Sequence, residues 1–297
     1  MIVYGCAVTD AEAFARYAEP GIRALSAAEP ETEVIALASV GTIFRNYNLI
    51  REQVAERDDL EALVLVHQDA EIVDPDCSAK IRAALAGPDV AIVGCAGAVG
   101  VRSIAWWEGA VTWASFTHRY EEMGGGEIPA VSWRPPDTPG YAKLGEVDAV
   151  DGFVLALSPW AVRNLSFDES LGARHGYDLD LCLQARSAGK KVVTADLKVV
   201  HHHSLELVAD PERWVEAHIA VAEKWEGFLD EQPADADEWR ARARRAEAEA
   251  SVYRLMMGGA QLQRDAAQAQ LHLTRETTSW RITAPLRSLT SRLRRRR

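Results

Sequence analysis

The residues of this chain best suited to chemistry follow an apolar run, at His67, Asp69 and Glu71. Positions 67, 69 and 71 share one face if the strand continues, because strand side chains alternate between faces. Ligands bind at the carboxyl ends of strands in an open parallel sheet. Mg²⁺ and Mn²⁺ favour oxygen ligands, and Mn²⁺ also accepts imidazole. The cluster therefore predicts a divalent-metal and phosphate site; a polar strand end that caps the next helix is the alternative.

A second group of titratable side chains, His175, Asp178 and Asp180, lies where a helix is expected to begin. Asp178 occupies the expected N-cap position, and capping does not exclude catalysis. Asp178 and Asp180 are about 200° apart around a helix, so both are not expected to face one site. One of them is predicted to be a cap or solvent-exposed residue.

Three consecutive histidines, His201, His202 and His203, close another apolar run. Adjacent strand residues face opposite ways, so at most His201 and His203 could bind the same ion. One metal-ligating histidine with surface neighbours is the preferred interpretation. A zinc hydrolase built on this run is the alternative.

The elements that would position these residues form an alternating pattern. Short β-branched runs alternate with amphipathic stretches, as in a parallel sheet covered by crossover helices. The expected strands span residues 2–8, 33–38, 62–67, 90–95, 147–157 and 191–201. The expected helices span residues 11–28, 47–56, 78–85 and 211–228, and a further one begins at Asp178 and ends at Gly189. The order predicts an α/β fold that opens as a nucleotide-binding sheet.

Between residues 96 and 144 this pattern gives way to Gly, Pro and Trp. A structureless stretch of this length predicts a functional loop or lid. Trp106, Trp107, Trp113 and Trp133 could offer apolar faces to a sugar or lipid acceptor. A satellite hydrophobic cluster under a loop is the alternative.

Composition narrows the class of protein. With 297 residues, 48% of them hydrophobic and 26% charged, the chain can bury a substantial core, and it is neither disordered nor fibrous. Its four cysteines form no C-x-x-C pair, which favours a reducing compartment. No window approaches the roughly 20 apolar residues of a membrane span, and no signal peptide is evident. The expected location is the cytoplasm.

The distribution of charge divides the chain. Residues 233–297 hold 14 Arg against 7 Asp and Glu, whereas residues 1–232 hold 19 Lys and Arg against 37 Asp and Glu. We therefore expect a catalytic or binding domain over 1–232 and an Ala/Arg/Glu-rich helical tail over 233–297. Residues 280–297 combine seven arginines with apolar residues and no acid, which predicts peripheral contact with an anionic membrane surface. A frayed basic terminus is the alternative.

At these clusters residues 1–230 resemble the inverting family 2 glycosyltransferases of the GT-A fold, in particular the branch related to a streptomycin-biosynthesis glycosyltransferase-like domain. The motifs that carry the resemblance are His67-Gln68-Asp69, the segment 147–153 with Asp151-Gly152-Phe153, the segment 175–183 with Tyr177-Asp178, Val199-Val200-His201 and, more weakly, the loop 42–48. The resemblance implies a nucleotide-diphospho-sugar transferase fold with a mostly parallel central sheet flanked by helices. The composition of residues 233–297 adds the expected helical C-terminal appendage.

The resemblance also implies roles for residues. The family's metal motif is two aspartates separated by one residue; here the pair is His67 and Asp69, so Asp69 is similar to the metal and diphosphate ligand. His67 then contacts the metal, the nucleotide or neither. Family members often have Glu-Asp where this chain has Tyr177-Asp178, which makes Asp178 similar to the catalytic base. His201 resembles a histidine that approaches the metal in some relatives, with His202 as the alternative if the strand slips by one.

Substrate contacts follow from the same resemblance. Nucleotide contacts are expected at Thr9, Asp10, Ser39 and Asn48, together with His67 and Asp69. Acceptor contacts are expected at Asp151, Gly152 and Trp106. The implied activity is metal-dependent (Mn²⁺ or Mg²⁺) transfer from a UDP-, GDP- or dTDP-sugar to a hydroxyl of a glycan or lipid-linked acceptor, with no nucleic-acid partner. A catalytically inactive sugar-nucleotide-binding or scaffolding protein of the same fold is the alternative.

Overall fold

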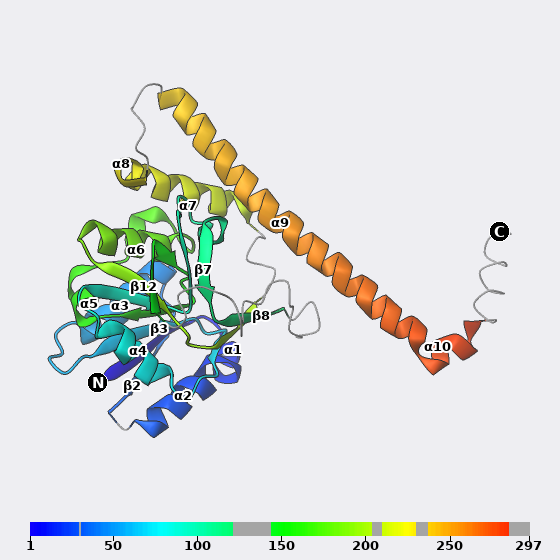
Figure 1. Ribbon diagram of the computed structural model, residues 1–297, viewed down its shortest axis with the longest axis horizontal. Helices are drawn as coiled ribbons and strands as arrows, with labels where there is room; N and C mark the ends of the chain where they lie inside the picture. Colours follow the sequence, from blue (N-terminus) through cyan, green and yellow to red (C-terminus); the bar gives the residue numbers. More distant parts are fainter. Residues whose placement is uncertain (30, 121–143, 204–209, 230–236, 285–297) are drawn as a thin grey trace. The chain divides into compact units, whose positions relative to one another are not determined.

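The computed structural model describes residues 1–29, 31–120, 144–203, 210–229 and 237–284. It divides into two compact units, Met1–Val252 and Tyr253–Arg297. The first unit extends past residue 232 because Arg245 pairs with Glu212 at 3.1 Å and Ser251 donates to Glu108 at 2.9 Å. Arg245 and Ser251 lie on the long helix α9 (Asp237–Glu276), which continues into the second unit (Figure 1).

A seven-stranded sheet forms the centre of the first unit, with the order β2-β1-β3-β11-β5-β12-β9. Its strands are β1 (Ile2–Val8), β2 (Glu33–Ala38), β3 (Ala62–Val66), β5 (Val90–Gly94), β9 (Leu144–Val147), β11 (Val154–Leu157) and β12 (Lys191–Ala195). Five strands run in one direction, and β9 and β11 run against them. The expectation of a mostly parallel central sheet is confirmed.

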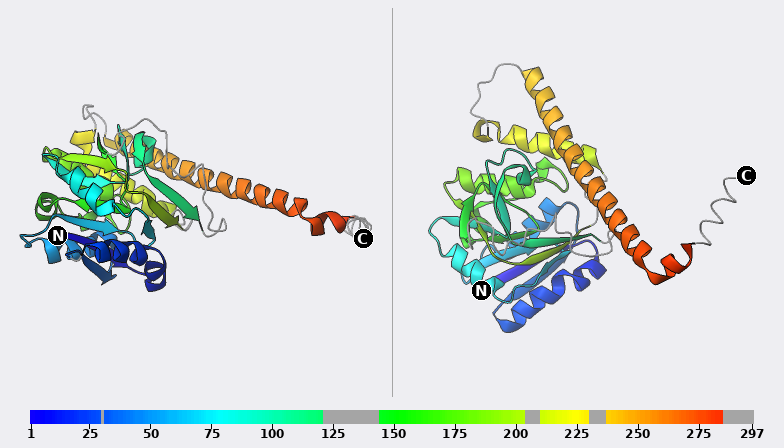
Figure 2. Two further views of the ribbon diagram at one scale, coloured as in Figure 1. Left: turned by 60° about the horizontal axis from the view of Figure 1, so that its bottom comes forward. Right: turned by 45° about the vertical axis from the view of Figure 1, so that its right-hand side comes forward.

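Helices cover both faces of this sheet (Figure 2). The Tyr4 hydroxyl bonds Ser78 of α4 (Cys77–Leu85) at 2.8 Å, whereas the open Cα of the next residue, Gly5, faces Ile50 of α3 (Ile43–Val54). Because successive strand residues point to opposite faces, α4 and α3 lie on opposite sides. α2 (Ala18–Ala28) lies beside α4, because Glu29 at its end forms an ion pair with Arg82 of α4. α5 (Pro159–Asn164) contacts α3.

The expected strand over 147–157 is wrong as a single strand. It divides into β9, β10 (Ala149–Val150) and β11, because Asp148 and Asp151 donate their backbone N–H groups to Ala98 and Ala96 of a neighbouring small sheet. The expected strand over 191–201 likewise divides into β12 and β13 (Val199–His203). The turn between them includes Lys198 at φ 47°.

The expected structureless segment 96–144 is ordered over its first half. It forms β6 (Ala96–Val99), the 3-10 turn η1 (Trp106–Glu108), β7 (Ala110–Ala114) and β8 (Phe116–Tyr120). These strands build two small sheets, β10-β6-β7 and β4-β13-β8, with β4 at Ala70–Ile72. Residues 121–143, with Trp133, lie outside the described part. β6 and β7 pair with each other, but β6 also pairs with β10 and β8 pairs with β13, partners from distant parts of the chain that sequence periodicity does not reveal.

The helices differ from expectation in their ends and breaks. The expected helix 11–28 breaks at Tyr17 into α1 (Ala11–Arg16) and α2, and Pro20 in the first turn of α2 lacks the N–H needed to continue α1. The remaining helices are α6 (Tyr177–Ser187), α7 (Pro211–Lys224), α8 (Glu226–Leu229) and α10 (Thr278–Ile282).

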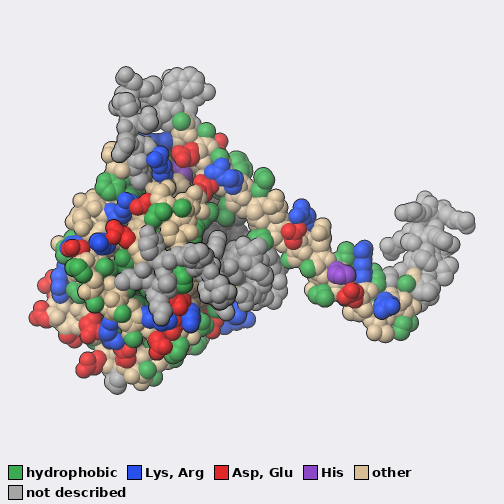
Figure 3. Space-filling model, viewed as in Figure 1, with side chains coloured by type: hydrophobic (Ala, Val, Ile, Leu, Met, Phe, Trp, Pro, Cys, Tyr) green, Lys and Arg blue, Asp and Glu red, His purple; other side chains and the backbone are tan. Residues whose placement is uncertain are grey.

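Within the described residues, no helix combines the length and apolar character of a membrane span. Acidic and basic side chains are interspersed on the face seen in Figure 3.

Asp180 fixes α6 to α7 and is neither a helix cap nor exposed, contrary to the sequence expectation. Its side chain is 1% exposed; it pairs with Lys224 at 2.7 Å and accepts from the Trp225 indole at 2.8 Å. Its third partner, the Gln184 amide at 2.7 Å, is also a donor, so an Asn NH₂ in place of a carboxylate oxygen would be a buried donor without an acceptor.

We predict that Asp180→Asn lowers the free energy of unfolding by on the order of 2–3 kcal/mol, measured by chemical denaturation, because charge-assisted hydrogen bonds are lost and a buried donor is left unsatisfied. Asp168→Asn is the matched control, because Asp168 pairs with the same Lys224 amine at 2.7 Å but exposes 32% of its side chain. Surface pairs contribute about 0–1 kcal/mol, so this variant should lose no more than that. Equal losses in the two variants would contradict the prediction.

Candidate functional site

Three metal-capable side chains meet beyond the end of β3. His67 follows that strand, and Asp69 lies in the turn before β4. β13 pairs antiparallel with β4 in a register that sets His201 opposite Ala70, and the His202 N–H donates to the Asp69 carbonyl at 2.8 Å. This pairing places His201 beside Asp69 although more than a hundred residues separate them.

The geometry of this cluster suits a bound cation. Asp69 Oδ1 lies 3.4 Å from His201 Nε2 and 3.8 Å from His67 Nδ1. One ligand atom from each of the three residues lies within 4.8 Å of the others. The side chains of Asp69 and His67 are 31% and 26% exposed, so a solute can reach them, whereas His201 is 4% exposed. Two imidazole nitrogens and a carboxylate oxygen are ligands that Mn²⁺ and other transition metals accept.

Asp69 and His67 have the protonation states that metal binding requires. Burial by itself would raise the pKa of Asp69, but His201, His67 and a backbone hydrogen bond together outweigh burial and lower that pKa to about 2. Burial lowers the pKa of His67 to about 4. At neutral pH Asp69 is therefore a carboxylate and His67 a neutral imidazole, as ligation demands.

The neighbouring residues His202 and Glu71 form a separate pair. His202 bonds Glu71 at 2.8 Å and stacks on Tyr17 with ring centroids 3.9 Å apart. His202 therefore faces away from the cluster, and it is His201 that lies beside Asp69. The expectation that Glu71 shares a face with His67 and Asp69 applies only if the strand continues. The strand does not continue, because a turn in which the Ala70 N–H donates to the His67 carbonyl interrupts it. The His203 side chain lies outside the described part.

Asp178 lies in the first turn of α6, one residue after its start. Gly176, at φ 82°, occupies the N-cap, so the expected N-cap at Asp178 is wrong. Only a residue that tolerates the left-handed region can begin the helix this way. The Asp178 carboxylate instead accepts the N–H of Gly152 at 3.0 Å and that of Leu179 at 2.9 Å.

A second carboxylate, Asp151, lies near Asp178. It accepts from the Trp106 indole at 2.7 Å and from the Phe153 N–H at 3.3 Å. Burial raises the pKa of Asp178 to about 7, and the nearby charge of Asp151 adds to this effect. Burial also raises the pKa of Asp151. A carboxyl whose pKa lies near neutrality suits proton transfer.

Tyr177 connects the metal-capable cluster to Asp178. Its hydroxyl lies 2.7 Å from His67 Nε2. Burial raises its pKa, as do Tyr47 and then the carboxylates Asp178, Asp151 and Asp69, which all lie close enough to act on its ring. The structure thus brings five of the expected site residues close to one phenol: His67, Asp69, Asp151, Gly152 and Asp178.

Sequence reasoning missed both Tyr177 and His118. His118 pairs with His201 in the β8–β13 register, is buried, and has its ring centroid 5.4 Å from that of His201. The alternation of Phe116 and His118 was a usable strand signal, but it fell in the segment expected to lack structure. For Tyr177 the only signal was its place directly before Asp178.

Two of the expected nucleotide contacts lie beside the cluster. Gln68, between His67 and Asp69, accepts the N–H groups of Thr9 and Asp10 at 2.8 and 2.9 Å and donates to the Thr9 hydroxyl. The Asp10 carboxylate caps α1. The ends of β1 and β3 are therefore joined at this edge of the sheet.

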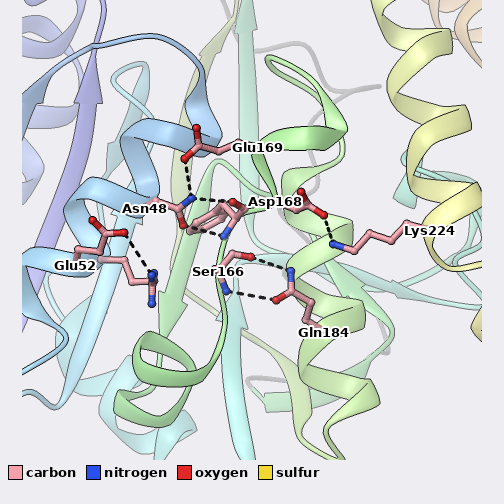
Figure 4. A pocket seen from close by; sticks show the side chains of 9 residues that line it. Asn48, Glu52, Ser166, Asp168, Glu169, Gln184 and Lys224 are labelled. Atoms are coloured by element: carbon pink, nitrogen blue, oxygen red, sulfur yellow. Dashed lines mark hydrogen bonds and ion pairs between the residues drawn. The ribbon is translucent and has the colours of Figure 1, made fainter.

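Ser39 and Asn48 have structural partners. The Ser39 hydroxyl accepts from Asn46 at 2.8 Å. Asn48 exchanges two hydrogen bonds with the backbone of Phe167, at 2.8 and 2.9 Å. Asn48 also lines a cavity of about 400 Å³ with Glu52, Gln184 and Lys224 (Figure 4). That cavity shares no lining residue with the metal-capable cluster.

The three expected acceptor residues, Asp151, Gly152 and Trp106, have different surroundings. Trp106 is 3% exposed and lies behind Asp151, so its ring is not presented to solvent. A Cβ added at Gly152 would lie 2.3 Å from the Tyr177 hydroxyl, so this glycine makes room for the phenol. The backbone carbonyl of the next residue, Phe153, accepts the backbone N–H of His67. The Phe153 ring stacks on the imidazole of His201, with ring centroids 4.3 Å apart.

Comparisons with known proteins agree with this architecture. The sequence model of a family described as "Glycosyltransferase like family" matches residues 6–220. The "Streptomycin biosynthesis protein StrF" of Streptomyces griseus is 28% identical over 207 residues, covering 69% of this chain and 67% of that protein. The structure of GalNAc-T7 with UDP, GalNAc and Mn²⁺ has a TM-score of 0.50 at 10% identity, covering 84% of this chain and 54% of that chain.

A second solved structure is the mannosyltransferase PcManGT from Pyrobaculum calidifontis in complex with GDP-Man and Mn²⁺. Its TM-score is 0.48 at 14% identity, covering 97% of this chain and 83% of that chain. The likeness to GalNAc-T7 confirms the GT-A fold expected from the sequence.

We predict that Asn48→Ala lowers the free energy of unfolding by on the order of 1–3 kcal/mol, because it removes the hydrogen-bond partner of the buried N–H and carbonyl of Phe167. Asn164→Ala is the control, since Asn164 is exposed and makes one bond, to the Trp160 carbonyl. Chemical denaturation measures both. Unchanged stability in Asn48→Ala with weaker sugar-nucleotide binding would instead favour the nucleotide contact expected from the sequence.

Proposed function

Because this chain is a member of the glycosyltransferase-like family, we propose that it is a metal-dependent, inverting glycosyltransferase. It would move a sugar from a nucleotide-diphosphate donor to a hydroxyl of a glycan or lipid-linked acceptor. The observation that carries the proposal is the convergence of a metal-capable cluster and a carboxylate of raised pKa on Tyr177.

In this proposal His67, Asp69 and His201 hold a divalent cation. When bound, the cation would neutralise the negative charge that develops on the departing diphosphate, an effect worth several kcal/mol in the transition state. The donor set supports this, since its ligand atoms converge and two of its side chains are accessible. GalNAc-T7, which shares the fold, was solved with UDP and Mn²⁺.

Asp178 is the proposed general base. In an inverting transfer the acceptor oxygen attacks the anomeric carbon as the bond to the diphosphate oxygen breaks, and the base removes the hydroxyl proton. The N–H groups of Gly152 and Leu179 fix the orientation of the carboxylate. Asp151 and Gly152 would lie nearest the acceptor, since they adjoin Asp178.

The donor is assigned to the edge formed by Thr9, Asp10, Gln68 and Asp69. The joined ends of β1 and β3 offer a hydroxyl and carboxylates beside the metal-capable cluster. A thermal-shift panel of UDP-, GDP- and dTDP-sugars with and without Mn²⁺ identifies the donor, because a ligand that binds the native state raises its stability.

The tail is proposed as a membrane-contacting appendage. Residues 280–297 carry seven arginines and no acid, which favours an anionic surface. In this proposal the protein acts in the cytoplasm and associates peripherally with the inner face of the membrane.

A second candidate function is sugar-nucleotide binding without turnover. The observation that favours it is His67, which stands where the resembled metal motif has its first aspartate. Release of nucleoside diphosphate from the donor identified by the thermal-shift panel separates the two functions, since only an enzyme turns the donor over.

We predict that Asp69→Asn weakens Mn²⁺ binding at least tenfold in isothermal titration calorimetry with the donor present, because it removes the only carboxylate of the cluster. His202→Gln is the control, since His202 adjoins His201 but faces Glu71. It should bind Mn²⁺ as the wild type does. Unchanged affinity in Asp69→Asn would exclude Asp69 as a ligand.

We predict that Asp178→Asn reduces transfer by about 10²–10⁴-fold while donor binding stays unchanged, because the amide cannot accept the proton. The wild-type rate should rise as pH increases through about 7, since Asp178 acts only when deprotonated. That rise should be absent from the residual activity of the variant. Asp148→Asn, which alters a carboxylate paired with Arg186, is the control. Full activity in Asp178→Asn would assign the base elsewhere.

A further inference from the structure

The Tyr177 hydroxyl is held in place by packing that does not involve the metal-capable cluster. Tyr177 is the first residue of α6 and is 6% exposed. Phe44 and Tyr47 of α3 meet it edge-on, with ring centroids 6.0 and 5.6 Å away. Gly152 leaves the space that the hydroxyl occupies. The phenol is therefore a fixed group to which His67 must adjust.

His67 has two ring nitrogens with different surroundings. Nε2 lies 2.7 Å from the Tyr177 hydroxyl, and Nδ1 faces Asp69 at 3.8 Å. A neutral imidazole has one N–H donor and one acceptor nitrogen, and only the unprotonated nitrogen can bind a metal. The Tyr177 hydroxyl can donate to Nε2 or accept from it. When its oxygen accepts the Nε2–H, the Nδ1 lone pair is directed at the cluster.

We propose that Tyr177 is a positioning residue of the metal site: its hydroxyl oxygen accepts the Nε2–H of His67 and thereby fixes the tautomer and ring orientation that present Nδ1 to a cation. The inference rests on the proposed metal-dependent function. It also gives α6 two tasks, because Tyr177 orients a metal ligand and the adjacent Asp178 is the proposed base.

The first test reads the tautomer without any metal. Long-range ¹H–¹⁵N NMR of the metal-free wild type at neutral pH should show His67 protonated at Nε2 and bare at Nδ1. In Tyr177→Phe the Nδ1–H tautomer should become populated. Wild-type His67 protonated at Nδ1 would overturn the proposal, and this result does not depend on whether the variant folds.

The second test reads Mn²⁺ affinity by isothermal titration calorimetry. Loss of the partner that orients a ligating histidine typically costs 10–100-fold in metal affinity, so Tyr177→Phe should bind Mn²⁺ that much more weakly. Tyr4→Phe is the matched control, because it also removes a buried hydroxyl, one bonded to Ser78 at 2.8 Å on the α4 side of the sheet. Its Mn²⁺ affinity should equal that of the wild type.

The outcomes separate this inference from the proposed function. Wild-type affinity in Tyr177→Phe overturns the role of Tyr177 and leaves the metal site standing. Equal losses in Tyr177→Phe and Tyr4→Phe also overturn it, since they would show a general effect of lost buried hydroxyls. A wild type that binds no Mn²⁺ removes the metal site itself, and the inference with it.

Discussion

The site depends on the register in which β13 pairs with β4 on one side and β8 on the other. That register sets His201 against the turn that carries Asp69 and beside His118, residues that are otherwise remote in the chain. A slip of one residue would exchange His201 for His202, because strand side chains alternate between faces. The His202–Glu71 pair and the Tyr17 stack on the opposite face oppose such a slip. Contacts that take no part in the cluster thus determine which histidine belongs to it.

Two aspartates at this edge of the sheet have opposite pKa shifts, and their neighbours explain why. Both lose solvation, which favours the neutral acid. For Asp69 the imidazoles of His201 and His67 and a backbone hydrogen bond together outweigh that loss, so the carboxylate persists to about pH 2. Asp178 has another carboxylate nearby, Asp151, and its pKa rises to about 7. Such divergent environments let one residue type serve as a ligand in one place and as a base in another.

The sequence predicted those parts of the fold and site that depend on local pattern. The strands 2–8 and 33–38 agree with β1 and β2 at both ends, and His67, Asp69 and His201 do come together. The errors lie where distant partners decide. Asp148 and Asp151 bond a remote strand and divide β9 from β11, and Gly176 moves the helix start ahead of Asp178. Tyr177 could not be assigned from sequence because its significance lies in a contact across 110 residues.

The two positions at which this chain departs from the resembled family pattern contact each other. His67 stands in place of the first aspartate of the metal motif and Tyr177 in place of a glutamate, and their side chains are 2.7 Å apart. Each exchange removes a carboxylate, so the cluster keeps Asp69 as its only anion. A glutamate at 177 would bring a negative charge against a buried neutral imidazole, whereas a phenol offers an uncharged oxygen to its N–H. The proposed donor set of two imidazoles and one carboxylate suits Mn²⁺ and later transition metals better than Mg²⁺. The paired departures thus replace two carboxylates by a hydrogen-bonded imidazole and phenol.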